Sequence, residues 1–117
     1  MRIRAAALAG AIVLAGWQAR EAQAADRFFA FNLTTTTDIT GLYLAPAGTG
    51  NWGPNQVLND PDKVLDHSER LKLTGITRGR YDVKVTYGKD RTCVKPGIDL
   101  TKDLTFDIRD ADLAKCK

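Results

Sequence analysis

The chain is 117 residues long, of which 44% are hydrophobic and 26% charged, and its formal net charge is +3 at pH 7. This length allows one domain with one modest core, which buries only about 60–65% of the surface that the unfolded chain exposes. Removing Arg2, Arg4, Arg20 and Glu21, which all lie in the first 24 residues, lowers the net charge to +1. A nearly neutral chain without a block of basic residues lacks the positively charged surface that binds nucleic acid. We therefore expect no nucleic-acid partner.

Residues 1–24 have the pattern of a secretory signal peptide. Arg2 and Arg4 supply a positive start, and residues 5–17 form an apolar run. Residues 22–24 are Ala-Gln-Ala, the small-x-small sequence that signal peptidase cuts. We therefore expect the leader to be removed.

The mature chain, residues 25–117, is expected to be exported. The apolar run of the leader is too short to cross a bilayer as a stable helix, and no stop-transfer segment follows it. The sequence therefore predicts a single monomeric domain without a transmembrane segment. Its expected location is the periplasm or the medium.

The first predicted strand covers residues 27–35. Its alternation places Phe29, Phe31 and Leu33 on one face, and threonines prolong its β-branched character. The opposite face carries Ala30, Asn32 and Thr34.

A second predicted strand covers residues 39–45, but its inward face is ambiguous. Two sets of apolar side chains compete for that face, and Gly41 between them marks a candidate β-bulge. The competing sets are Ile39 with Tyr43, and Leu42 with Leu44.

Residues 80–87 show the clearest strand pattern, because apolar and polar side chains alternate throughout. Residues 88–90, Gly-Lys-Asp, predict a turn, after which residues 91–95 return antiparallel until Pro96-Gly97 ends the strand. The inward residues are expected to be Tyr81, Val83, Val85 and Tyr87.

Two shorter strands complete the predicted fold, at residues 70–73 and 104–108. Asp110 is a candidate cap for a helical turn that ends near Ala114. Short strands punctuated by glycine and proline predict an all-β fold. We expect a small antiparallel β-sandwich of about six to seven strands with a short C-terminal helical turn.

Cys93 and Cys116 are the only cysteines, and both lie in the exported part. An oxidising compartment favours a disulfide between them, which would stabilise the fold by about 3 kcal/mol through the unfolded state. The alternative is a pair of free, redox-active thiols, although the spacing is not C-x-x-C.

The longest interruption between strands, residues 46–67, contains Trp52 on a glycine-rich loop. Long loops are often functional, and an aromatic ring on one can stack on a sugar or on a partner's apolar surface. The alternative is that Trp52 folds back and plugs one open end of the sandwich. The candidate ligand-binding residues are Asn51, Trp52 and Asn55.

A known sequence pattern runs in order through residues 31–34, 39–46, 51–53, 81–85 and 98–100. On these residues the mature chain resembles a family of small, exported, uncharacterised β-domain proteins of alphaproteobacteria. The resemblance implies an exported β-domain but no activity, although some members carry an argininosuccinate lyase label. Members often have cysteines where this chain has residues 79–80 and Thr101, so the family disulfide does not transfer.

Asp60, Asp62 and Asp66 offer a weak candidate for a calcium site. They resemble the start of an EF-hand loop, but Leu65 replaces the turn glycine and Leu71 replaces the bidentate glutamate. A solvated acidic loop is the simpler interpretation. We therefore expect neither a metal site nor another cofactor.

The segment Asp66-His67-Ser68 contains the only histidine and the only serine. Residues adjacent in sequence cannot form a catalytic relay, because the members of a triad come together from separate parts of a fold. With no catalytic constellation and no metal-ligand cluster, we expect that the protein is not an enzyme.

Four basic residues on the solvent-exposed faces of two predicted strands form a further candidate binding surface. If these strands pair, Arg70, Lys72, Arg80 and Lys84 converge into a basic strip. Such a strip is either an ordinary solvated sheet face or a contact for anionic polymers or lipid head groups.

The leading hypothesis is a non-catalytic periplasmic or secreted module that binds an envelope protein or glycan. The alternative is a structural or stress-related envelope protein without a small ligand. A small hydrolase or a weak calcium-binding protein agrees less well with the residues present.

Overall fold

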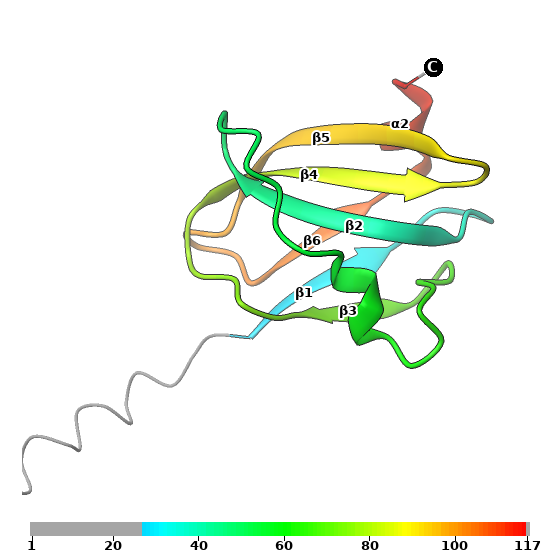
Figure 1. Ribbon diagram of the computed structural model, residues 1–117, viewed down its shortest axis with the longest axis horizontal. Helices are drawn as coiled ribbons and strands as arrows, with labels where there is room; N and C mark the ends of the chain where they lie inside the picture. Colours follow the sequence, from blue (N-terminus) through cyan, green and yellow to red (C-terminus); the bar gives the residue numbers. More distant parts are fainter. Residues whose placement is uncertain (1–26, 117) are drawn as a thin grey trace, which may run out of the picture.

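The computed structural model describes residues 27–116, and within them the fold is all-β (Figure 1). Two three-stranded sheets carry the architecture, with a single turn of 3-10 helix, η2 (Gln56–Asn59), and a C-terminal helix, α2 (Asp110–Ala114). The strands are β1 (Phe28–Asn32), β2 (Ile39–Pro46), β3 (Arg70–Leu73), β4 (Arg80–Tyr87), β5 (Arg91–Asp99) and β6 (Thr105–Ile108). The predicted signal peptide lies outside the described residues.

The predicted small all-β fold is confirmed, with one difference in strand direction. The sheet β2-β4-β5 is antiparallel throughout, whereas in β3-β1-β6 the central strand is antiparallel to β3 and parallel to β6. The parallel pair joins the first and last strands of the chain. Nearly the whole fold separates these two strands in sequence, so no tight hairpin dictates their direction. No helix within residues 27–116 is long and apolar enough to cross a membrane.

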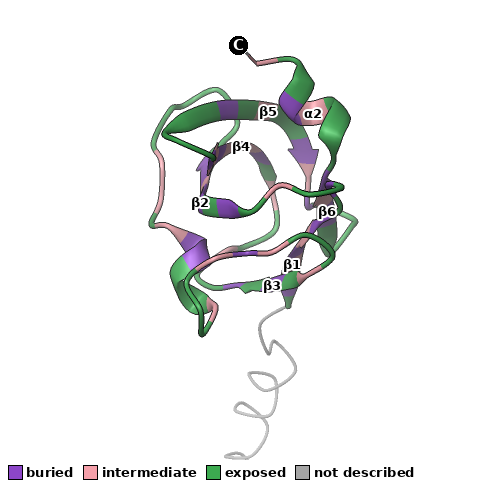
Figure 2. Ribbon diagram, turned by 90° about the vertical axis from the view of Figure 1, so that its right-hand side faces the viewer, coloured by how far each residue is buried: buried purple, intermediate pink, exposed green. Residues whose placement is uncertain are grey.

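The two sheets face each other across one hydrophobic core (Figure 2). The alternation predicted for β4 is confirmed, because its four apolar side chains all point into this core. Residues from both sheets and from the loops are fully buried, among them Phe28, Ile39, Leu42, Leu65, Leu100 and Ile108.

Strand β1 buries the face opposite to the one that carries Phe29 and Phe31. Phe28, Ala30 and Asn32 point inward, whereas Phe29 and Phe31 are only half-buried on the outer face. The Asn32 side chain is tolerated in the core because both ends of its amide are satisfied. Its Nδ2 donates to the carbonyl oxygens of Thr37 and Leu65, and its Oδ1 accepts from the backbone and hydroxyl of Thr34.

Two bulges let strands keep their apolar residues inside. In β2 the register shifts between Ile39 and Gly41, so Ile39 and Leu42 are both buried although they lie three positions apart. In β5 the register shifts around Pro96-Gly97, where Gly97 has a φ of 73°. The prediction that the strand ends at Pro96 was therefore wrong, because the bulge accommodates a residue without an N–H and the strand continues to Asp99.

Helix α2 is held against β5 by Lys95. The Lys95 Nζ donates to the Asp107 carbonyl oxygen at 2.6 Å and to the Asp112 carboxylate at 2.9 Å. The predicted helical turn is confirmed, but its cap is not Asp110. The Asp112 carboxylate instead accepts from the backbone N–H of Arg109 at 2.8 Å, while the Asp110 carboxylate accepts from Thr35.

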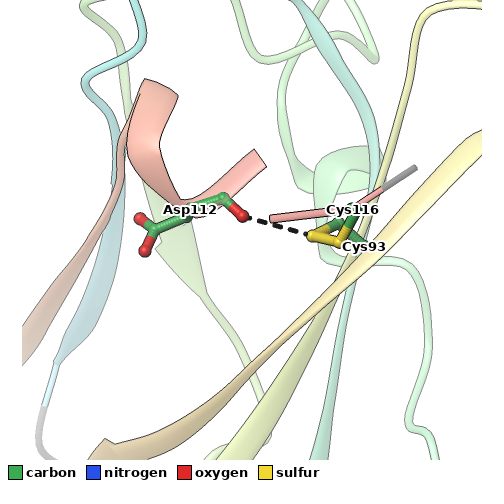
Figure 3. The surroundings of a disulfide bond; sticks show 3 residues. All are labelled: Cys93, Asp112 and Cys116. Carbon is green, nitrogen blue, oxygen red and sulfur yellow. Dashed lines mark hydrogen bonds between the residues drawn. A yellow bond between two sulfur atoms is a disulfide. The ribbon is translucent and has the colours of Figure 1, made fainter. Parts of the chain in front are cut away.

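A disulfide between Cys93 of β5 and Cys116 fixes the chain end after α2 (Figure 3). The two Cα atoms lie 5.5 Å apart, which is an ordinary spacing for this bond. The Cys93 Sγ also lies 3.3 Å from the Asp112 carbonyl oxygen, so the sulfur packs directly against the helix. The predicted pairing is confirmed.

Replacing both cysteines by serine should lower the free energy of unfolding by about 3 kcal/mol, because the bond closes a loop of 23-residue separation in the unfolded chain. Thermal denaturation with and without dithiothreitol measures the effect. The reductant should destabilise the wild type and leave Cys93→Ser/Cys116→Ser unchanged. Equal melting temperatures for wild type and variant under oxidising conditions would contradict a stabilising bond.

The Asp112 carboxylate should make the docking of α2 pH-dependent. Partial burial alone would raise the pKa of Asp112, but hydrogen bonds from the Arg109 backbone and the Lys95 ammonium outweigh burial and lower it below its ordinary value of 3.8. A lowered pKa in the folded state adds stability that is complete at neutral pH. This stability is lost as the pH falls through the folded-state pKa.

Asp112→Asn should therefore cost about 1 kcal/mol at pH 7, and its stability should converge with that of the wild type as the pH falls through the folded-state pKa of Asp112. Chemical denaturation at several pH values measures the difference. A cost that does not change with pH would mean that the carboxylate charge contributes nothing.

Candidate functional site

The Trp52 loop lies along the edge of β2, on the outside of the sandwich. The backbone N–H of Gly53 donates to the Leu44 carbonyl oxygen at 2.9 Å, and the Trp52 N–H donates to the Gly50 carbonyl oxygen at 3.0 Å. The Trp52 side chain is half-buried and does not belong to the hydrophobic core. The plug interpretation is therefore wrong, because the Gly53 hydrogen bond joins the loop to β2 and the Trp52 ring lies against the outward-facing Lys84.

The Lys84 ammonium lies against two aromatic rings. Its Nζ is 4.9 Å from the centroid of the Tyr43 ring and 5.0 Å from that of Trp52. Tyr43 is the cross-strand partner of Lys84, so strand register supplies one ring and the loop supplies the other. Among the residues that the structure describes, Lys84 forms no ion pair. The rings thus position a cation that has no ion-pair partner in the part of the chain that the structure describes.

Gly41 makes room for the Tyr43 ring. A Cβ at position 41 would lie 3.0 Å from Cε1 of Tyr43 and 3.0 Å from Cβ of Thr86. The missing side chain lets the ring lie back along its own strand. Gly41 thus both allows the bulge in β2 and positions an aromatic residue of the candidate site.

Val94 continues this surface on the third strand of the sheet. It is the cross-strand partner of Lys84 and is 46% exposed. We call Tyr43, Trp52, Lys84 and Val94 the aromatic-lysine patch. The sequence predicted Trp52 as a contact and Lys84 as a basic surface residue, but it missed Tyr43 and Val94. A tyrosine two positions after a strand glycine was the available signal for Tyr43.

Asn55 has a structural role instead of the predicted ligand contact. Its Oδ1 accepts from the backbone N–H groups of Leu42 and Val57, and its Nδ2 donates to the Thr40 carbonyl oxygen. These bonds occupy the side chain along the free edge of β2. The side chain of Asn51, in contrast, is exposed next to Trp52. The backbone N–H of Asn51 donates to the Thr49 hydroxyl at 3.1 Å.

The four predicted basic residues do not form one strip. β3 and β4 belong to different sheets, so Arg70 and Lys72 lie on one side of the sandwich and Arg80 and Lys84 on the other. Arg80 is 3.5 Å from the Asp99 carboxylate. The strip depended on the pairing of these two strands, and they do not pair. The apolar alternation of a strand does not encode its partner.

The acidic loop does not gather its three aspartates into a cation site. No group of three or more potential metal ligands occurs within residues 27–116. The Asp60 carboxylate instead accepts the backbone N–H of Asp62 at 2.8 Å. Burial raises the pKa of Asp66, and the nearby charges of Glu69, Asp38 and Asp62 raise it further.

His67 and Ser68 are both exposed in the loop before β3. Ser68 has a φ of 71°, and its backbone N–H donates to the Asn32 carbonyl oxygen at 2.6 Å. This bond joins the loop to the end of β1. The role of this segment is therefore structural, because it turns the chain from the loop into β3.

Comparison with known proteins supplies no relative for this site: no protein-family model, curated protein or solved structure matches the chain.

The contrast between the two asparagines can be tested by mutation. Asn55→Ala should lower the free energy of unfolding by about 2 kcal/mol, because it leaves two backbone N–H groups without their acceptor. Asn51→Ala is the matched control and should cost less than about 0.5 kcal/mol. Chemical denaturation measures both, and equal effects would contradict the structural role of Asn55.

Proposed function

We propose that the protein is a non-catalytic, exported binding module that contacts its ligand through the aromatic-lysine patch. The observation that carries this proposal is the Lys84 ammonium, held about equally far from the rings of Tyr43 and Trp52 and without an ion-pair partner among the described residues. Ordinary sheet faces do not need two aromatic side chains to hold one cation.

The chemistry of the patch suits an acidic glycan of the cell envelope. Aromatic rings stack on the apolar faces of sugars, and a partly desolvated ammonium attracts a carboxylate or phosphate group. The exposed side chain of Val94 extends the apolar contact across the sheet. The patch is built on a β-sheet, so much of it is preorganised before the ligand arrives.

Export is supported by two independent features. The first 24 residues have the pattern of a signal peptide, and the disulfide between Cys93 and Cys116 suits an oxidising compartment. Together they favour the periplasm or the medium as the location. The resemblance to exported β-domain proteins agrees with this proposal.

A structural envelope protein without a small ligand is the second candidate. It is favoured by the amide side chains that form hydrogen bonds within the protein and so are not available to a ligand. Gln56, for example, is 2% exposed and bonds both to Thr74 and to Asn59. Such a network stabilises a rigid domain whether or not the domain binds anything.

Trp52 provides a direct reporter of binding, because it is the only tryptophan after the leader. Protein purified from the exported fraction should have the mass of a chain that begins at Ala25. When hexuronate oligosaccharides are added to this protein, the Trp52 fluorescence should change in a saturable way. Neutral hexose oligosaccharides of the same length should bind at least about tenfold more weakly, because they lack the charge that Lys84 attracts.

Variants separate binding from folding. Trp52→Ala and Lys84→Gln should each abolish or strongly weaken retention on immobilised hexuronate. Each should cost less than the ~3–5 kcal/mol that truncating a buried core tryptophan costs. Unchanged retention of both variants would reject the patch as the binding site. A melting temperature that collapses in Trp52→Ala would favour the structural candidate.

A further inference from the structure

The outer face of the sheet β3-β1-β6 carries apolar side chains where a two-layer sandwich usually carries polar ones. Phe29 and Phe31 point outward from the central strand and are half-buried, and Leu33, which continues their alternation, is 40% exposed. No element among residues 27–116 packs over this row. It lies on the opposite side of the sandwich from the aromatic-lysine patch, because the two patches occupy the outer faces of different sheets.

Two cations flank the apolar row on the neighbouring strand. Arg70 is the cross-strand partner of Phe31, and Lys72 is that of Phe29. The Arg70 guanidinium lies 4.5 Å from the centroid of the Phe29 ring. Within the described part of the chain, neither Arg70 nor Lys72 forms an ion pair.

The acidic group on this face is already neutralised. Asp107 is the β6 partner of Phe31, and its carboxylate lies 3.0 Å from the Arg109 guanidinium. Within the strands β1, β3 and β6, the charges that remain without an ion pair are those of Arg70 and Lys72, and both are positive. A guanidinium stacked on a ring keeps its N–H edge free, and that edge matches the oxygens of a phosphate group.

We propose that this face, defined by Phe29, Phe31, Leu33, Arg70 and Lys72, docks the protein on the surface of an anionic phospholipid bilayer. Aromatic and aliphatic side chains bordered by basic residues are the combination that binds the lipid interface, where apolar groups enter the head-group region and cations attract lipid phosphates. A broad sheet surface suits a bilayer better than it suits a small ligand. Docking in this way leaves the aromatic-lysine patch facing away from the membrane.

Vesicle flotation tests the charge contribution with a matched control. The mature protein should float with vesicles of phosphatidylglycerol and phosphatidylcholine, but not with phosphatidylcholine alone, and higher salt should weaken the association. Arg70→Gln/Lys72→Gln should reduce the partition coefficient about 25-fold, at about fivefold for each cation. The control is Lys89→Gln/Arg91→Gln, which removes the same charge from the turn between β4 and β5 and from the start of β5. It includes an arginine whose guanidinium lies 5.5 Å from the centroid of the Tyr87 ring. The control should lose less than about threefold.

A second pair of variants tests the apolar contribution. Leu33→Ser should weaken partitioning several-fold, whereas Leu58→Ser, at a position 55% exposed in η2, should not. Melting temperatures verify that all variants are folded. Absence of flotation, or equal losses in the paired variants, would overturn the proposal. So would a dimer in light scattering that Arg70→Gln/Lys72→Gln dissolves, because a second copy of the chain would then cover the face.

Discussion

The constraint on which this fold depends is the closure of two small sheets that share no strand. Each sheet has only three strands, so four of the six strands are edges with unpaired backbone groups. The segment around η2 closes one side of the sandwich. There Asn55 bonds the edge of β2, and Gln56 and Asn59 bond the end of β3. A short polar segment thus does what a further strand does in a larger sandwich.

The other side is closed by different chemistry. Lys95 of β5 reaches the backbone of β6 and the first turn of α2, and the disulfide ties β5 to the chain end. These contacts use a charge and a covalent bond because β5 and β6 are not hydrogen-bonded neighbours in a sheet. Both are sensitive to conditions, the first to acid and the second to reductant.

Closure at the edges leaves the outer faces of both sheets available. One outer face carries a lysine between two aromatic rings, and the other carries an arginine stacked on Phe29 beside an apolar row. In both cases an aromatic side chain orients a cation that has no ion-pair partner among residues 27–116. Two such surfaces on opposite sides suit a module that connects a membrane surface with a ligand facing away from it, which is the arrangement that the two proposals together describe.

The amino-acid sequence by itself predicted where the strands lie and which cysteines pair, because periodicity, turn chemistry and a lone cysteine pair are local or unique features. It missed the continuation of β5 beyond Pro96, because the bulge there depends on the partner strand. The alternation of β4 predicted its buried face, and Gly41 predicted the bulge in β2. Only the tertiary structure decided which strands are neighbours, because pairing depends on the packing of segments that are distant in sequence. That decision separated Arg70 from Lys84 and brought Tyr43 to Trp52. It also assigned Asn55 to the edge of β2, since an amide bonds whichever backbone groups the fold leaves unpaired within its reach.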